Sequence, residues 1–263
     1  MKPASPHSRT ARRGITLRMV APNAVTAMAM CFGLTGVRYG ISGEWERAVL
    51  AILIAGVLDG LDGRIARLLR GESRFGAELD SLSDSIAFGV APALILYLWS
   101  LQSMPKFGWI FALAHALSCA LRLARFNANI DADVQPRKAA GFLTGVPAPA
   151  GAGLAFVPLY LWLVTGADIF RAWYVVAPWT AFTAFLMISG ISTYSWSSLR
   201  LRKRIRLEAI ALAGLLAALL ITDPWLTLLL ICAIYLALIP FGMMSYARVK
   251  KAQKPMETGV GDV

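Results

Sequence analysis

Long apolar runs separated by short polar stretches make up most of the chain. Each run is close to the about 20 residues that an α-helix needs to cross the hydrocarbon core of a bilayer. The pattern therefore predicts an all-α integral membrane protein with about eight transmembrane helices. The predicted segments are 20–38, 47–69, 79–101, 107–125, 144–165, 172–191, 206–222 and 225–246. Asp223 and Pro224 interrupt the last long run, which we expect to form a tight helical hairpin.

The polar stretches are too short to separate two folded units. We expect one membrane domain over residues 20–246, a basic cytoplasmic tail over 1–19 and a polar cytoplasmic tail over 247–263. The composition of 57% hydrophobic and 16% charged residues fits no ordinary water-soluble domain. The three cysteines and two histidines have no metal-ligand spacing, so we interpret them as structural or incidental.

The basic residues give the expected topology. Lys and Arg gather before the first predicted segment and after segments two, four, six and eight, as expected for cytoplasmic loops. Both termini are therefore predicted to be cytoplasmic, in a multi-pass protein of the inner cell membrane. The formal net charge of +11 is divided among these loops, which favours attraction to anionic membrane lipids over binding of nucleic acid.

Four carboxylates interrupt the second and third predicted segments. An ionised side chain at bilayer depth costs about 2.5 to 3.5 kcal/mol, so such residues mark functional sites. Asp59 and Asp62 share one helical face, as do Asp80 and Asp84, because of their spacing. A turn around residues 71–74 leaves each pair about ten residues, or roughly 15 Å, from the turn. We therefore expect the two pairs to converge at one depth, near the cytoplasmic face.

Four converging carboxylates would repel one another unless cations lay between them. Oxygen ligands suit Mg²⁺, Mn²⁺ or Ca²⁺, whereas Zn²⁺ favours Cys or His. Four acids suffice for two ions about 3.5 to 4 Å apart, an arrangement that neutralises a phosphoryl group. Gly60 and Gly63 beside the acids leave room either for a nucleotide or for close helix packing. Arg67 can hold a phosphate or serve only as a topology charge.

The spacing of this motif, DxxDGxxAR followed after eight residues by GxxxDxxxD, resembles the signature of the CDP-alcohol phosphotransferase family. It is filled by Asp59, Asp62, Gly63, Ala66, Arg67, Gly76, Asp80 and Asp84. Members are integral membrane enzymes that move a phosphatidyl or similar group from a CDP-linked donor to an alcohol and release CMP. The resemblance implies that the four aspartates hold two divalent ions, Mg²⁺ or Mn²⁺, with Asp84 also the general base. It implies that Gly63, Arg67 and Gly76 contact the cytidine diphosphate.

Other segments extend the resemblance. Pro22, Asn23 and Thr26 form a PNxxT pattern in which Asn23 and Thr26 would contact the nucleotide, although Pro at a helix start explains part of it. The pieces RLARFN, which starts at Arg122, and FxxGxPxPA, which starts at Phe142, resemble phosphatidylserine synthases. This likeness implies CDP-diacylglycerol as donor, L-serine as acceptor and a homodimer. Arg122, Arg125 and Lys138 are then candidates for binding the serine carboxylate or the donor phosphate, or are inside-positive topology charges.

Two alternatives stay open from the residues. The same chemistry could act on glycerol phosphate or an inositol phosphate, although a phosphorylated acceptor needs more cationic contacts. A cation transporter also places acids within the membrane. Its polar groups usually extend through the membrane's depth, whereas the acids here gather in one hairpin.

Overall fold

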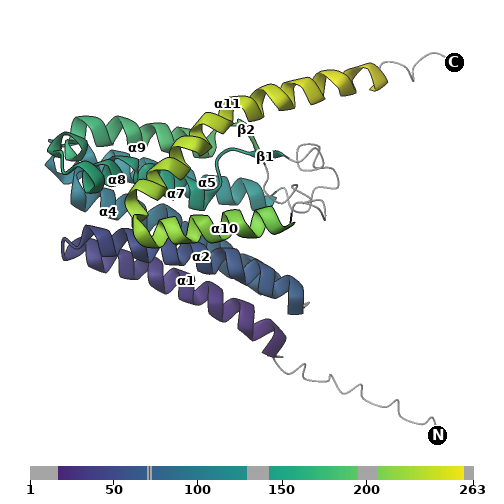
Figure 1. The fold of residues 1–263 in the computed structure, drawn as a ribbon, viewed down its shortest axis with the longest axis horizontal. Coiled ribbons are helices and arrows are strands. Elements are labelled where there is room, and N and C mark those ends of the chain that lie inside the picture. Colours follow the sequence, from purple (N-terminus) through teal and green to yellow (C-terminus); the bar gives the residue numbers. More distant parts are fainter. Residues whose placement is uncertain (1–16, 70, 72, 129–141, 195–205, 258–263) are drawn as a thin grey trace, which may run out of the picture.

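The protein is described by a computed structural model that covers residues 17–69, 71, 73–128, 142–194 and 206–257. Its helices form one bundle, and most of them run along the long axis of the molecule (Figure 1). In chain order the elements are α1 (Leu17–Ile41), α2 (Trp45–Leu69), α3 (Arg74–Asp84), the π-helix η1 (Ser85–Val90), α4 (Ala91–Trp99), the 3₁₀-helix η2 (Leu101–Ser103), α5 (Gly108–Ala128), β1 (Phe142–Thr144), α7 (Ala148–Ala155), α8 (Val157–Thr165), the 3₁₀-helix η3 (Asp168–Arg171), α9 (Trp173–Ile188), β2 (Ser192–Tyr194), α10 (Arg206–Thr222) and α11 (Pro224–Glu257).

Helices overlap each of the eight predicted segments. By length and apolar composition, four of the described helices can cross a membrane, namely α1, the continuous run from α3 to α4, α5 and the first part of α11. The pair α7 and α8 would make a fifth span, with a bend of 40° between its halves. Helix α2 carries carboxylates within its apolar run, and α9 and α10 have only 16 and 17 residues. The chain is thus a multi-pass membrane protein, while the count of eight spans and the cytoplasmic termini stay predictions.

The bend between α7 and α8 has a local cause. Phe156 has a ψ of 0°, and Pro158 in the first turn of α8 has no backbone N–H to continue the helical ladder of α7. Helix α8 ends at Gly166, whose φ of +68° is the left-handed conformation that glycine adopts without steric cost.

A short strand pair adds to the expected all-α fold. Strand β1 pairs antiparallel with β2, with Leu143 opposite Thr193. The pair joins the chain before α7 to the chain after α9. Strands of three residues are too short to produce a recognisable alternation of apolar and polar positions, so the sequence predicts helices only.

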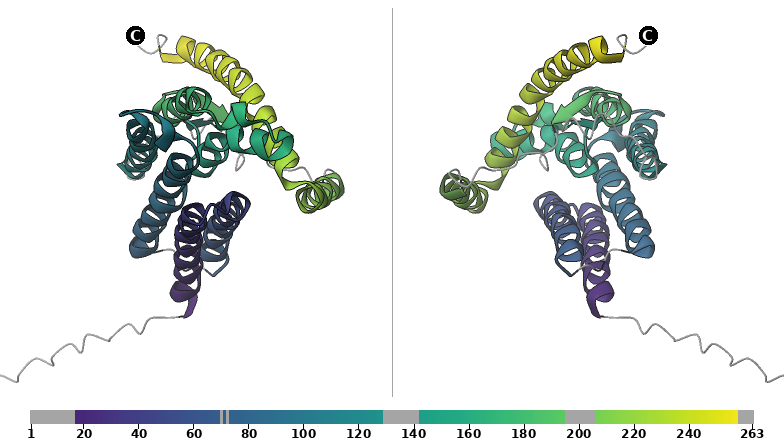
Figure 2. Two further views of the ribbon diagram at one scale, coloured as in Figure 1. Left: turned by 90° about the vertical axis from the view of Figure 1, so that its left-hand side faces the viewer. Right: turned by 90° about the vertical axis from the view of Figure 1, so that its right-hand side faces the viewer.

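The core lies where η1 and α4 meet the helices around them. Phe88, Ile95, Leu96 and Trp99 are fully buried there, against side chains of α2, α5, α7 and α8. Helix α10 lies at the outer edge of the bundle, and apolar residues such as Ile221 face outward from it (Figure 2). Such outward apolar surface is what a lipid environment requires.

Helix α1 approaches η1 at backbone distance. A Cβ added at Gly33 would lie 2.7 Å from the Cα of Ala87. No larger residue fits at Gly33 unless one of the two helices shifts, so this glycine fixes how closely α1 and η1 pack.

The far end of the bundle, near the start of α2, holds a cluster that we call the Arg171 cluster. Its members are Trp45, Trp99, Ser100, Trp162 and Arg171. Arg171 Nε donates to the Trp99 carbonyl at 3.0 Å, and the Arg171 carbonyl accepts from Ser100 Oγ at 2.6 Å. Its guanidinium carbon lies 5.9 Å from the centre of the Trp45 ring and 5.7 Å from that of Trp162. These contacts tie α2, α4 and α8 to η3.

Candidate active site

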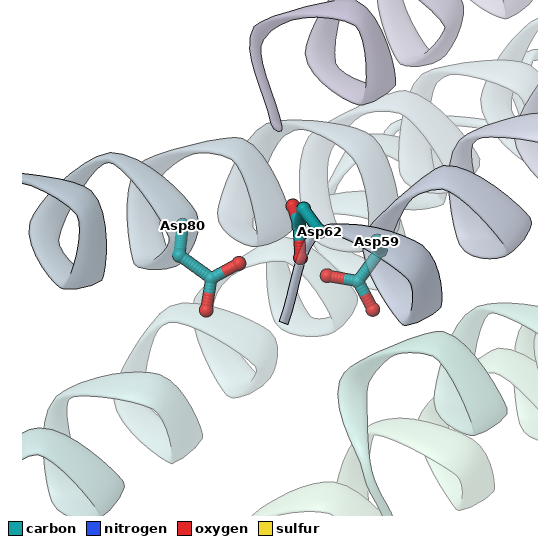
Figure 3. Close-up of side chains that lie close together, drawn as sticks. All are labelled: Asp59, Asp62 and Asp80. Carbon is teal, nitrogen blue, oxygen red and sulfur yellow. The ribbon is translucent and has the colours of Figure 1, made fainter. Parts of the chain in front are cut away.

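Three carboxylates meet between α2 and α3. Asp59 and Asp62 lie in the second half of α2, and Asp80 lies in α3. One oxygen from each of the three lies within 4.8 Å of the others. Figure 3 shows the three side chains close together. Helical spacing predicts this convergence, and the structure confirms it for these three residues.

Helix α1 holds the two acidic helices in register. It contacts both α2 and α3. The Thr26 hydroxyl donates to Asp62 Oδ2 at 2.6 Å, and Ser83 Oγ donates to the Thr26 carbonyl at 3.0 Å. The side chains of Thr26 and Ser83 are buried, and that of Asp62 is only 5% exposed. A single residue of α1 therefore links both acidic helices, a role that the motif spacing does not reveal.

Asp84 lies at the end of α3, immediately before the π-helix η1. It is outside the group of three, but its carboxylate interacts with Asp59, Asp80 and the Arg122 guanidinium. Its Oδ1 is buried and has no hydrogen-bond partner among the described residues. The structure therefore brings three of the four predicted metal ligands together and leaves the fourth beside Asp59.

The donor set fits a divalent cation. The group consists of carboxylates alone, with no Cys or His among its described members. Hard oxygen donors of this kind favour Mg²⁺, Mn²⁺ or Ca²⁺ over softer transition metals. The unpartnered buried oxygen of Asp84 is a further donor that a cation would satisfy.

A pocket of about 310 Å³ opens beside Asp62 and Asp80. All five residues predicted to contact the nucleotide line it, which are Asn23, Thr26, Gly63, Arg67 and Gly76. Its volume is in the range of small-molecule sites. The pocket therefore joins the α1 pattern PNxxT to the carboxylate motif, although these segments lie far apart in the sequence.

Two glycines shape this pocket in different ways. A Cβ added at Gly76 would lie 2.9 Å from Asn23 Oδ1 and 3.2 Å from Ser73 Oγ, so a side chain there would displace one of these two polar groups. A Cβ added at Gly63 would meet no described atom within 4 Å. Gly63 therefore leaves open space on the pocket wall instead of permitting close helix packing.

Ser73 lines the pocket and was not among the predicted site residues. It caps the N-terminus of α3, and its Oγ accepts from the Gly76 backbone N–H at 3.0 Å. Ser followed by a helical pattern is a recognised start signal, so the sequence could have identified it. The first turn of α3 lines the pocket through Ser73, Gly76 and Ala77, and the start of a helix is a place that suits phosphate.

The three predicted acceptor-binding residues have different surroundings. Arg122 lies near Asp84, on the face of α5 that meets η1. Arg125 Nη1 donates to the Ile188 carbonyl at the end of α9, at 2.9 Å. Lys138 lies outside the described residues. Arg122 thus lies beside one of the four predicted metal ligands.

Comparison with known proteins gives consistent matches over this region. The family model described as CDP-alcohol phosphatidyltransferase matches residues 19–189, and the model described as CDP-alcohol phosphatidyltransferase 2 matches residues 204–240. The first match contains the whole carboxylate motif and the pocket.

Three curated relatives share one name. The CDP-diacylglycerol–serine O-phosphatidyltransferase of Mycobacterium tuberculosis is 37% identical over 89% of this chain and 81% of the relative. The protein of the same name from Mycobacterium leprae is 37% identical over 88% of this chain and 77% of its own length. A shorter match, at 37% identity, covers 53% of this chain and 57% of the Helicobacter pylori protein of that name.

Proposed function

The chain belongs to the CDP-alcohol phosphatidyltransferase family, and from this premise we propose that it transfers the phosphatidyl group of CDP-diacylglycerol to the hydroxyl of L-serine. The products are phosphatidylserine and CMP. The observation that carries the proposal is the pocket in which Asp62 and Asp80 share a wall with the five predicted nucleotide contacts. The choice of serine is supported by the names of the relatives. Family membership also argues against the cation transporter.

The pocket residues would bind the cytidine diphosphate. Asn23 and Thr26 offer hydrogen-bonding groups from α1, and Arg67 offers a guanidinium for phosphate from the end of α2. The capped N-terminus of α3 also lines the pocket, where the positive end of the helix dipole would favour phosphate. Gly63 and Gly76 keep the two walls free of side chains that would fill the space.

Asp59, Asp62, Asp80 and Asp84 would hold Mg²⁺ or Mn²⁺, and the number of carboxylates suits two ions. When bound, the ions would neutralise the pyrophosphate and stabilise the charge that develops on the leaving CMP. Thr26 orients the Asp62 carboxylate through its hydrogen bond, so the ligand geometry is partly set before any ion binds.

Asp84 would act as general base. The serine hydroxyl oxygen forms a bond to the phosphorus that carries diacylglycerol, the bond from that phosphorus to CMP breaks, and Asp84 takes the hydroxyl proton. Arg122 lies beside Asp84, where its charge could orient the Asp84 carboxylate or the serine carboxylate. A carboxylate is a weak base, so positioning and charge neutralisation must supply most of the acceleration.

We propose that the site faces the cytoplasm of the cell in the inner membrane, within one membrane domain over residues 20–246. Basic residues flank the segment that carries the site. The start of α1, the end of α2 and the end of α11 lie on the same side of the bundle in Figure 1, which agrees with this topology. Pairing of two chains stays a prediction.

The decisive experiment compares acceptor alcohols. Purified protein is incubated with CDP-diacylglycerol, Mg²⁺ or Mn²⁺, and either serine, glycerol phosphate or inositol phosphate, and CMP release is measured. We expect CMP with serine and formation of phosphatidylserine. A clear preference for glycerol phosphate or inositol phosphate would replace the acceptor, and no CMP with any alcohol would contradict the proposed chemistry.

A further inference from the structure

The π-helix η1 directly follows Asp84 and is unusual in its packing. π-Helical turns are rare and often occur at functional sites, because the added residue changes the direction of the side chains on either side. Three consecutive residues of η1, Ala87, Phe88 and Gly89, are all buried. Ala87 meets Gly33 of α1, and Phe88 lies near Gly56 of α2. The orientation of η1 is therefore set by several neighbouring helices at once.

Helix α5 contacts η1 on its remaining side. A Cβ added at Gly89 would lie 3.0 Å from the Cβ of Cys119, so the Cys119 side chain packs directly against the backbone of η1 at this glycine. Four residues before Cys119 along α5, His115 is fully buried and its Nε2 lies 3.2 Å from the Phe88 carbonyl oxygen. Three residues after Cys119, Arg122 lies close enough to Asp84 for their charges to interact. Residues at this spacing share one face of a helix.

The hydrogen bond defines the state of the imidazole. A carbonyl oxygen only accepts, so Nε2 carries the proton and donates. The other ring nitrogen, Nδ1, is buried and has no hydrogen-bond partner in the described part of the chain. Burying a polar ring with only one of its two nitrogens hydrogen-bonded costs free energy. The surroundings of His115 thus point to the Phe88 bond as the reason for histidine here.

We propose that His115 is a positioning residue, whose hydrogen bond to the Phe88 carbonyl holds the π-helical turn and thereby fixes the direction in which Asp84 presents its carboxylate. The effect of His115 on turnover rests on the proposed function of Asp84. His115 acts through the backbone of Phe88, and this is its one hydrogen bond in the described part of the chain.

The test compares three variants in the full-length protein. His115→Gln places an amide nitrogen near the position of Nε2 and keeps the donor, whereas His115→Leu removes it. Ser118→Ala changes another buried polar residue of α5 that forms no hydrogen bond to η1 among the described residues, and it is the matched control. If His115→Leu yields no folded protein, His115→Asn replaces it, because the shorter amide cannot reach Phe88.

Hydrogen exchange by mass spectrometry gives the readout that is independent of activity. We expect faster amide exchange over residues 84–90 in His115→Leu, and wild-type exchange in His115→Gln and Ser118→Ala. Unchanged exchange in His115→Leu would overturn the proposal, even if the protein showed no activity toward serine.

Turnover gives the second readout. For His115→Leu we expect kcat to fall roughly tenfold to a hundredfold, as for a misplaced catalytic group, while KM for CDP-diacylglycerol changes less than about twofold. His115→Gln should regain most of the loss. Full activity of His115→Leu, or equal loss in His115→Gln, would contradict a positioning role. Absence of CMP release by the wild-type protein would instead count against the proposed function.

Discussion

The two ends of the bundle satisfy their charged groups in different ways. At the far end, the Arg171 guanidinium has a carbonyl acceptor and two tryptophan rings around it, all supplied by the chain. At the site, Asp59, Asp62 and Asp80 gather, and none of them forms an ion pair with a Lys or Arg of the described residues. The charged group at the far end thus has its partners within the protein, whereas the carboxylates at the acidic end have oxygens left to coordinate a cation.

Replacing one acid at each end should affect turnover very differently, and this is the largest effect that we expect. We expect Asp84→Asn to lower CMP formation at least about a thousandfold, or roughly 4 kcal/mol in the barrier, because the base and a ligand oxygen are lost together. Glu44→Gln at the far end, where Glu44 pairs with Arg47 on the surface, should leave turnover unchanged. The measurement is CMP release with saturating Mn²⁺. Intact turnover in Asp84→Asn would remove Asp84 from the mechanism.

The two ends should also differ in how they change the effect of a bound metal on the stability of the folded protein. A ligand present at a hundredfold its Kd stabilises the folded state by about 2.7 kcal/mol. We expect Mn²⁺ to raise the Tm of the wild-type protein in detergent, and chelation with EDTA to lower it and to stop CMP release. Asp62→Asn should lose most of the Mn²⁺ effect, and Arg171→Gln should keep it. An equal response of wild type and Asp62→Asn would place the cation elsewhere.

Breaking the Arg171 cluster should cost stability and spare the chemistry. Arg171→Gln removes a charged hydrogen-bond donor and two ring contacts, for an expected loss of about 2 kcal/mol in unfolding free energy. Thermal unfolding measures the loss, and KM and kcat at a temperature where the variant is folded should match the wild type. Arg47→Gln, which removes an exposed ion pair, is the control and should cost less than about 1 kcal/mol. Lost activity in folded Arg171→Gln would show that the two ends are coupled.

The smallest expected effect concerns the pocket wall. In Gly76→Ala, the new Cβ would press against Asn23 and Ser73, which should raise KM for CDP-diacylglycerol about tenfold, or roughly 1.4 kcal/mol. Gly214→Ala on α10 is the control, because a Cβ there meets nothing within 4 Å. Steady-state kinetics separate the two variants. An unchanged KM in Gly76→Ala would mean that the nucleotide does not use this wall.

The sequence predicted the acidic site well because helical geometry is local. Spacings of three and four residues fix which carboxylates share a face, and the short turn fixes their common depth. The convergence of Asp59, Asp62 and Asp80 follows from these two facts alone. The lining of the pocket by Asn23, on a separate helix, was available only through resemblance to a known family.

Other features depend on contacts between distant segments. Nothing in the spacing of Thr26 indicates that its hydroxyl would bind Asp62, because periodicity identifies a face but not its partner. The π-turn after Asp84 and the pairing of β1 with β2 have no sequence pattern of sufficient length. The hydrogen bond from Arg125 to the Ile188 carbonyl of α9 likewise joins segments far apart in the chain, and its predicted role in substrate binding stays a prediction.

The contact between Gly33 and Ala87 affects how the protein responds to bilayers of different thickness. Helix interfaces made of long side chains can adjust by changing rotamers when a membrane becomes thicker or thinner. The interface at Gly33 and Ala87 brings two backbones together and cannot adjust in this way. We therefore expect changes in lipid thickness to tilt α1 and η1 together as one rigid unit. The spacing of the acidic groups would then remain constant while the surrounding lipid varies.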